Sequence, residues 1–235
     1  MVEKSKKWRL FVGLLLIGVI VSAGCVGETP TEEGEASQAS TTEEASTATS
    51  SDEGTSLSDL LSKAGSTTSV KYDLVTTSPG NPTVTSTVWV KGNNMRMEMT
   101  AEGQKMITII NGDKQERYMY YPGENMAMKM DFSQAPESAV EEAVSIEQYN
   151  PTVIGTETID GKLCTVVEYA SPEGSAKMWI WQKHGFPIRM EMTTPEGTLR
   201  VEFKNIDFGD IPDNMFELPA GVDVIEMPGG MPNMP

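Results

Sequence analysis

The chain has 235 residues and a formal net charge of −16, from 34 acidic and 18 basic residues. Nucleic-acid phosphates attract basic proteins, so this charge argues against a nucleic-acid partner. An acidic surface also repels anionic lipid headgroups, so any membrane association needs a separate anchor. The two cysteines, Cys25 and Cys164, lie in such different settings that no disulfide framework is expected.

The N-terminus combines a basic start with a short apolar run. Four basic side chains precede the continuously apolar segment Leu10–Val21, and small residues follow it up to Cys25. This pattern is typical of a secretory signal peptide, here over residues 1–24. At ~1.5 Å per residue the apolar run would span roughly 18 Å, which is short for ~30 Å of bilayer hydrocarbon.

Ala23 and Gly24, immediately before Cys25, resemble the lipobox of prokaryotic lipoproteins, with Ser22 where leucine is usual. The resemblance implies cleavage and lipid attachment at Cys25, and hence an extracytoplasmic protein anchored to the cell membrane by lipid. Two acyl chains anchor a protein stably where one does not. The alternative is an uncleaved apolar anchor that continues to Val26 and leaves the rest of the chain on the same side.

Composition divides the rest of the chain into three parts. Residues 25–54 are rich in Ser, Thr and Glu and cannot bury enough apolar surface to fold, so they are expected to form a disordered tether. One domain is expected over residues 55–226, followed by a flexible Met/Pro/Gly tail over 227–235. The domain should begin with a short helix from Leu57, capped by Thr55 or Ser56 and ended by Gly65.

Strands with period-two alternation follow this helix up to residue 130. The alternation puts Met95, Met97 and Met99 on one face of a strand, and Met126, Met128 and Met130 on one face of another. Residues 133–149 break the pattern and are expected to form a second helix, with an apolar stripe of Ala139, Val140, Ala143, Val144 and Ile146.

Strand patterns resume at Thr152, and Asp160-Gly161 is a strong hairpin signal. In the last two long strands, Ile188, Met190 and Met192 are expected on one face, and Leu199, Val201 and Phe203 on one face. The pattern favours a mainly β protein with two or so helices. We expect a single curved antiparallel sheet, an open half-barrel of about ten or eleven strands in one continuous meander.

A series of short motifs runs through the C-terminal half: Trp179-Ile180-Trp181, Gly185-Phe186-Pro187-Ile188-Arg189, Phe203-Lys204-Asn205-Ile206, Ile211-Pro212-Asp213, Phe216 and Leu218-Pro219-Ala220-Gly221-Val222. Their order and spacing resemble the LolA-like lipoprotein-sorting family. That resemblance implies a half-barrel whose concave face is lidded by helices and holds lipids or the acyl chains of lipoproteins. The lipobox departs from the soluble carriers and favours a tethered relative over a long-range shuttle.

The methionine pattern by itself favours an adaptable apolar surface, because the thioether side chain is flexible and polarisable. The residues expected to line a lipid-binding cavity are Met95, Met97, Met99, Met126, Met128, Met130, Ile188, Met190, Met192, Val201 and Phe203. Charged residues such as Arg96, Glu98, Arg200 and Glu202 should mark the opposite, wet face. Two alternatives stay open: an ordinary packed core beneath the helices, and Cu(I) capture by thioethers, for which Met227, Met231 and Met234 are suggestive.

No constellation in the sequence indicates an enzyme. The one histidine, His184, falls in an expected hairpin turn, Cys164 is expected to be a buried thiol, and Glu141-Glu142 is interpreted as the solvated face of a helix. No cofactor or metal is expected. The predicted function is therefore non-covalent binding of lipid or lipoprotein acyl chains. The alternative is a non-catalytic surface module with a fully packed sheet and an envelope protein as partner.

Overall fold

The computed structural model describes residues 56–132, 138–172 and 174–226. The chain divides into two compact units, Met1–Gly54 and Thr55–Pro235, and every described residue belongs to the second. The expected signal peptide, lipidated Cys25, tether and Met/Pro/Gly tail all lie outside the described residues, as do the first residues of the second expected helix.

The described residues form twelve strands in one sheet, with few helices. The strands are β1 (Ser69–Thr77), β2 (Val84–Lys91), β3 (Asn94–Ala101), β4 (Gln104–Asn111), β5 (Glu116–Tyr121), β6 (Met126–Met130), β7 (Thr152–Ile159), β8 (Lys162–Ser171), β9 (Gly174–Trp181), β10 (Phe186–Thr194), β11 (Gly197–Asp207) and β12 (Asp223–Glu226). The helices are α1 (Leu57–Gly65), α2 (Ala139–Ser145) and the short 3₁₀ helices η2 (Ile146–Tyr149) and η3 (Asp213–Phe216).

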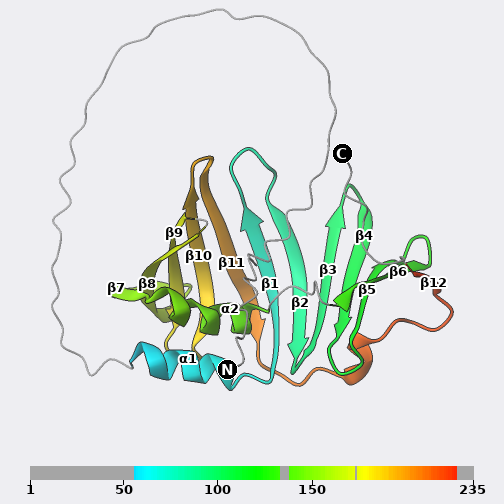
Figure 1. Cartoon of the computed structure of the whole chain (residues 1–235), viewed down its shortest axis with the longest axis horizontal. Helices are drawn as coiled ribbons and strands as arrows, with labels where there is room; N and C mark the ends of the chain where they lie inside the picture. The colour runs from blue at the N-terminus through cyan, green and yellow to red at the C-terminus, as the bar shows by residue number, and fades with distance from the viewer. Residues whose placement is uncertain (1–55, 133–137, 173, 227–235) are drawn as a thin grey trace, which may run out of the picture. The chain divides into compact units, whose positions relative to one another are not determined.

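The sheet is open, as predicted, and its strands run in the order β12-β6-β5-β4-β3-β2-β1-β11-β10-β9-β8-β7 (Figure 1). Two details differ from the expectation of one continuous antiparallel meander. The sheet consists of two meanders, β1–β6 and β7–β11, which are joined where β1 pairs with β11. The additional strand β12 pairs with β6 in parallel. Neither the β1–β11 pair nor the β6–β12 pair is connected by a hairpin, so no turn motif in the sequence predicts these pairings.

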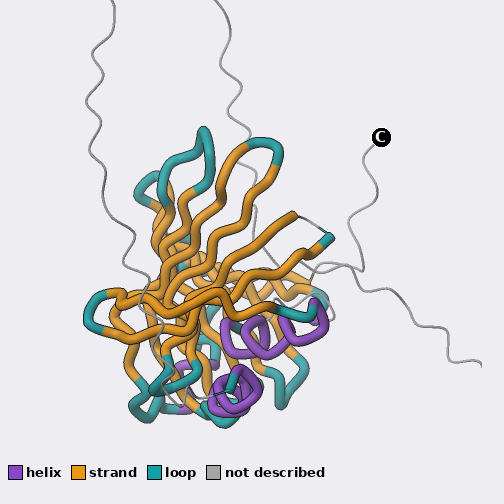
Figure 2. The backbone as a smooth tube through the Cα atoms, turned by 90° about the vertical axis from the view of Figure 1, so that its left-hand side faces the viewer, coloured by secondary structure: helices purple, strands orange, loops and turns teal. Residues whose placement is uncertain are grey.

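The two-meander order explains the position of the second helix. β6 lies near one edge of the sheet and β7 forms the other edge, so the chain between them has to cross the sheet. That connection carries α2 and η2, and α2 contacts both α1 and β10. Both helices lie near the same end of the strands (Figures 1 and 2).

Helix α1 begins as the sequence predicts, because the Ser56 hydroxyl accepts a hydrogen bond of 3.1 Å from the Asp59 amide. Its buried residues Leu60, Leu61 and Ala64 form the apolar side of the helix. Gly185, in the β9–β10 turn, lies directly against this helix, since a side chain there would collide with the Leu60 carbonyl. The turn and the helix therefore pack backbone to backbone.

Helix α2 begins with a capping box. The Ser138 hydroxyl accepts from the Glu141 amide at 3.3 Å, and the Glu141 carboxylate accepts from the Ser138 amide at 2.7 Å. Of the predicted stripe, Ala139, Ala143 and Ile146 are buried, whereas Val144 is 37% exposed. The expected solvated role of Glu141 is thus refined, because this exposed carboxylate also starts the helix.

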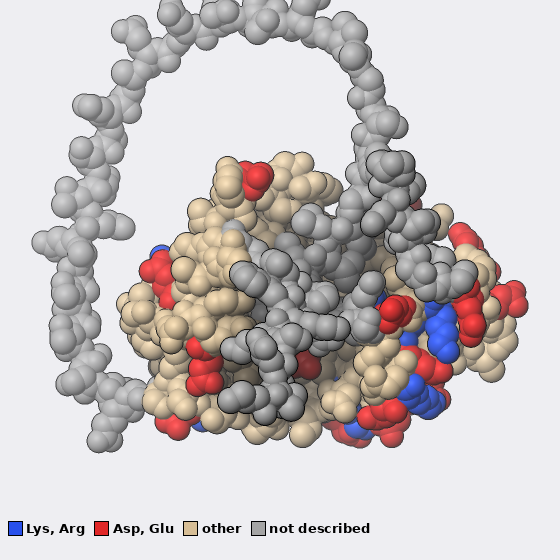
Figure 3. Space-filling view, in the orientation of Figure 1, with Lys and Arg blue, Asp and Glu red and all other residues tan. Residues whose placement is uncertain are grey.

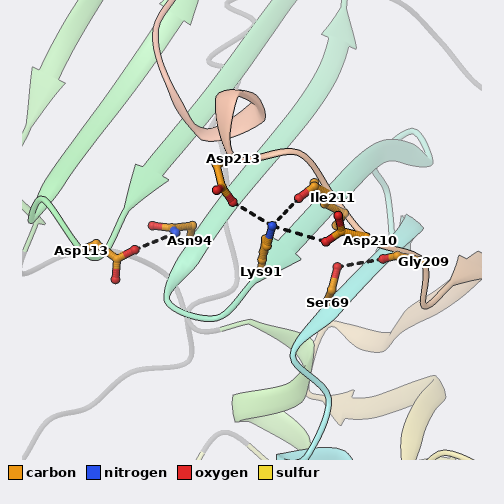
Figure 4. A network of polar contacts seen from close by, with 8 residues as sticks. All are labelled: Ser69, Lys91, Asn94, Asp113, Gly209, Asp210, Ile211 and Asp213. Atoms are coloured by element: carbon orange, nitrogen blue, oxygen red, sulfur yellow. Dashed lines mark hydrogen bonds and ion pairs between the residues drawn. The ribbon is translucent and has the colours of Figure 1, made fainter.

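The segment 209–222, between β11 and β12, is tied to the ends of β1 and β2 (Figure 4). The Lys91 ammonium donates to the Ile211 carbonyl and to the Asp213 carboxylate, each at 2.7 Å, and lies 3.3 Å from Asp210. The Ser69 hydroxyl donates to the Gly209 carbonyl at 2.8 Å. These contacts bring the segment to β3 and β4, which η3 contacts.

Candidate functional site

The strand register defines two faces of the sheet. Tyr169 of β8 stacks on Tyr149 of η2, and its hydroxyl donates to the sulfur of Met190 at 3.7 Å. The face that bears Tyr169 and Met190 is therefore the one that the helices approach, and we call it the helix face. Pairing carries this face across β11, β1 and β2, where Val201, Phe203 and Tyr72 belong to it.

On β3 to β6 the helix face carries three cross-strand rows of side chains, which we call the methionine rows. The first row is Met95, Ile110, Arg117 and Met130; the second is Met97, Thr108, Met119 and Met128; the third is Met99, Met106, Tyr121 and Met126. With strands ~4.8 Å apart and alternate residues ~6.8 Å apart, the rows cover an area of roughly 14 by 14 Å.

Burial divides the helix face into two halves. On β10 and β11, beside the helices, Met190, Met192, Val201 and Phe203 are at most 7% exposed, and Met95 at the start of β3 is also buried. In the methionine rows, seven methionines are half-buried: Met97, Met99, Met106, Met119, Met126, Met128 and Met130. The first half is a packed core, and the second is a continuous apolar surface with partial access.

All but one of the residues expected to line the site share the helix face. The exception is Ile188, whose predicted position beside Met190 and Met192 is wrong. Pro187 pairs with Ile180 and Arg189 pairs with Trp179, so Ile188 is the additional residue of a β-bulge. The bulge turns Ile188 to the other face of the sheet, where it packs with Trp179. Sequence alternation cannot reveal a bulge, because it assumes an unbroken period of two.

Several members of the rows were not predicted from the sequence, chiefly Met106, Met119 and Tyr121. Met106 lies opposite Met99, and Met119 lies between Thr108 and Met128. The Tyr121 hydroxyl donates to the Met119 sulfur at 2.8 Å, which links two members of neighbouring rows. Their strands are apolar on both faces, so alternation alone could not assign these side chains to one face.

The opposite, outer face carries the predicted charged rows. Arg96 lies 2.7 Å from Glu98, Arg200 lies 2.8 Å from Glu191, and Arg189 lies 3.4 Å from Glu202. Burial raises the pKa of Glu98, but hydrogen bonds from Lys105 and Arg96 outweigh it and hold that pKa below its ordinary value. Figure 3 views the molecule from the side on which α2 lies, and there charged side chains are visible mainly toward the end of the sheet that holds β5, β6 and β12.

The predicted charged rows do not cover the whole outer face. It carries two apolar clusters, one of which contains Cys164, Trp179 and Ile188. The other consists of Ile107, Ile109, Tyr120 and Ala127, and Leu218 and Val222 of the segment 209–222 pack against it. Both faces of the sheet are thus apolar over β4 and β5, and the C-terminal segment covers the outer one.

The remaining candidate groups in the described part of the chain are Cys164, His184 and the acidic side chains. Cys164 is fully buried, as predicted, and burial raises the pKa of its thiol to about 11. His184 lies in the predicted turn and stacks on Phe208, with ring centroids 4.3 Å apart. Within residues 56–132, 138–172 and 174–226, no three His, Cys, Asp or Glu side chains form a group that could hold a metal ion. None of the helices described there is both long enough and apolar enough to cross a membrane.

Comparison with known sequences gives two matches. Residues 71–183 match the family model of a domain of unknown function, DUF4412. An uncharacterized protein from Methanocaldococcus jannaschii is 24% identical over 163 residues, which are 63% of this chain and 48% of the relative. The chain therefore spans about half the length of this curated relative.

Several solved structures are similar to this one. A crystal structure of an uncharacterized conserved protein from Thermus thermophilus has a TM-score of 0.52 and 11% identity, over 73% of this chain and 97% of that one. The lipoprotein LppX of Mycobacterium tuberculosis has a TM-score of 0.45 and 18% identity, over 67% and 100%. A LolA superfamily protein from Nitrosomonas europaea has a TM-score of 0.33 and 16% identity, over 69% and 98%.

At these identities the likeness concerns the fold alone. The open, largely antiparallel sheet with helices against one face has the architecture that the sequence resemblance implied.

Proposed function

We propose that this protein binds acyl chains of lipids or lipoproteins on the methionine rows. In this proposal it works outside the cytoplasm, and lipid on Cys25 holds it at the cell membrane. The domain over residues 55–226 carries the binding surface, and residues 25–54 connect it to the anchor. No cofactor or metal takes part.

The observation that carries the proposal is the half-buried state of seven methionines on four adjacent strands. Apolar surface that remains partly wet can be stabilised by a hydrocarbon ligand at ~25 cal/mol per Å² removed from water. Methionine suits a variable acyl chain, since its three rotatable bonds and polarisable sulfur adapt to different apolar shapes. The packed half beside the helices supplies a rigid border to this surface.

Native mass spectrometry of the full-length protein purified from membranes, followed by titration with a fluorescent acyl probe, tests the proposal. Co-purifying acyl species and saturable probe binding are expected. A protein that carries no acyl species and binds no probe would contradict it. That result would favour the interaction module, for which the exposed edge strand β7 is a specific candidate surface because Val153 is 50% and Ile154 47% exposed.

Introducing a charge in the centre of the methionine rows tests whether the ligand binds there or elsewhere on the protein. Met128→Glu should weaken probe binding at least about tenfold, because a carboxylate resists transfer from water to contact with hydrocarbon. Leu163→Glu is the matched control, since Leu163 is an exposed apolar residue on distant β8. Equal binding by both variants would place the ligand elsewhere.

The anchor has its own test. Cys25→Ser should release the protein from the membrane fraction, because the thiol is the proposed site of lipid attachment. Full retention of this variant would contradict lipidation without bearing on the methionine rows.

A further inference from the structure

Arg117 is an unusual member of the methionine rows. It lies on β5 between Ile110 of β4 and Met130 of β6, and its next neighbour along the same face is Met119. It is 9% exposed, so this cation is as buried as the core residues. Among the twelve residues of the three rows, Arg117 alone carries a charge. It belongs to the first row, so it marks one end of the apolar surface.

A guanidinium in such a place is costly. Burial lowers the pKa of Arg117, and the nearby negative charge of Asp131 raises it. Arginine nevertheless keeps its proton in proteins, so the group remains a cation in a row of largely apolar side chains. Buried charges are ordinarily kept in a fold where they meet an opposite charge, and Asp131 supplies one within the protein.

We propose that Arg117 binds the anionic headgroup of the acyl ligand while the hydrocarbon chain lies along the methionine rows. This inference rests on the proposed function and narrows it to acyl ligands that end in a carboxylate or a phosphate. The planar guanidinium matches both groups, because it donates two parallel hydrogen bonds to a pair of oxygens. The position of Arg117 in the first row sets the direction of the ligand, with the headgroup at that end and the chain toward Met99 and Met126.

Asp131 adjusts the strength of this site. It is exposed, follows Met130 at the end of β6, and acts electrostatically on Arg117. Its carboxylate therefore opposes an incoming anion, both by repulsion and by competition for the same cation. Removing its charge is expected to strengthen the binding of an anionic ligand.

The experiment compares palmitate with its uncharged methyl ester as competitors for a neutral fluorescent acyl probe on the full-length protein. A charge-assisted hydrogen bond contributes ~1.5–3 kcal/mol, so palmitate should displace the probe roughly ten- to a hundred-fold better than the ester. Lysophosphatidate, in a parallel titration, identifies whether phosphate is preferred over carboxylate. Equal displacement by acid, phosphate and ester would overturn the inference and leave the proposed function intact, whereas the absence of any probe binding would overturn the proposed function itself.

Variants test whether Arg117 causes the preference for palmitate over its methyl ester. Arg117→Met should abolish the advantage of palmitate over the ester, and Asp131→Asn should increase that advantage. Arg200→Met is the matched control, because Arg200 is an exposed arginine on the outer face, paired with Glu191. If Arg117→Met fails to fold, the comparison of ligands on the wild-type protein and on Asp131→Asn still decides the matter. Retention of the full preference by folded Arg117→Met would contradict the assignment.

Discussion

His184 illustrates how a residue without an apparent site can still have a measurable property. Its ring stacks on Phe208 and lies 4.4 Å, centroid to centroid, from that of Trp181. Burial lowers the pKa of His184, and the positive charges of Lys183 and Lys63 lower it further. The folded protein therefore prefers the neutral ring more than the unfolded chain does.

This difference in pKa predicts how the free energy of unfolding changes with pH. Because the folded pKa is the lower one, the two states are equally unprotonated well above pH ~6.5, and the unfolded chain takes up the proton first as the pH falls. Wild type should lose stability between about pH 7 and 5 relative to His184→Phe, which keeps an aromatic ring but cannot titrate. Chemical denaturation of both proteins across that range measures the difference, and a difference that does not change with pH would contradict the prediction.

At the scale of the element, the contact between α1 and the β9–β10 turn depends on one glycine. Gly185 has a φ of 69°, and a Cβ there would meet the Leu60 carbonyl and the Ala64 amide. Two independent costs therefore apply to any larger residue: the left-handed backbone conformation and a collision with helical backbone.

Gly185→Ala should lower the free energy of unfolding by about 2–4 kcal/mol, as the sum of both costs. Gly80→Ala is the matched control, because Gly80 has a φ of 72° and no atom lies within 4 Å of the place that an added methyl group would occupy. It should lose about 1 kcal/mol, the conformational cost alone. Denaturant titration of the two variants gives both values, and equal losses would show that α1 does not hold this position.

At the scale of the whole domain, the two halves of the helix face should respond differently to the same substitution. Met190 is 4% exposed and accepts a hydrogen bond from Tyr169, whereas Met128 is half-buried in the methionine rows. The first is part of a packed core, and the second is part of the proposed binding surface.

Met190→Ala should destabilise the protein by about 2–5 kcal/mol, because it leaves a cavity in a packed region. Met128→Ala should cost about 1 kcal/mol, since less of its surface is removed from water. Thermal denaturation of the ligand-free variants ranks them, and the reverse order would mean that the methionine rows are the true core.

The local features of this protein could be predicted from its sequence. Ser56 and Gly65 bound the first helix, Asp160 and Gly161 adopt the positive φ angles of the predicted hairpin, and the alternation of Met95 to Met99 and of Met126 to Met130 holds. These features depend only on residues a few positions apart in the chain, so the local sequence is enough to predict them.

The contacts between elements that are far apart in the chain could not be predicted from the sequence and are seen only in the folded domain. The pairing of β1 with β11, the parallel strand β12 and the crossing of α2 join residues far apart in the chain. The bulge at Ile188 reversed one side chain, and the pairing of β4, β5 and β6 placed Arg117 among the methionines. Such arrangements follow from which apolar surfaces cover one another across the sheet, and that is a property of the packed domain and not of any single segment.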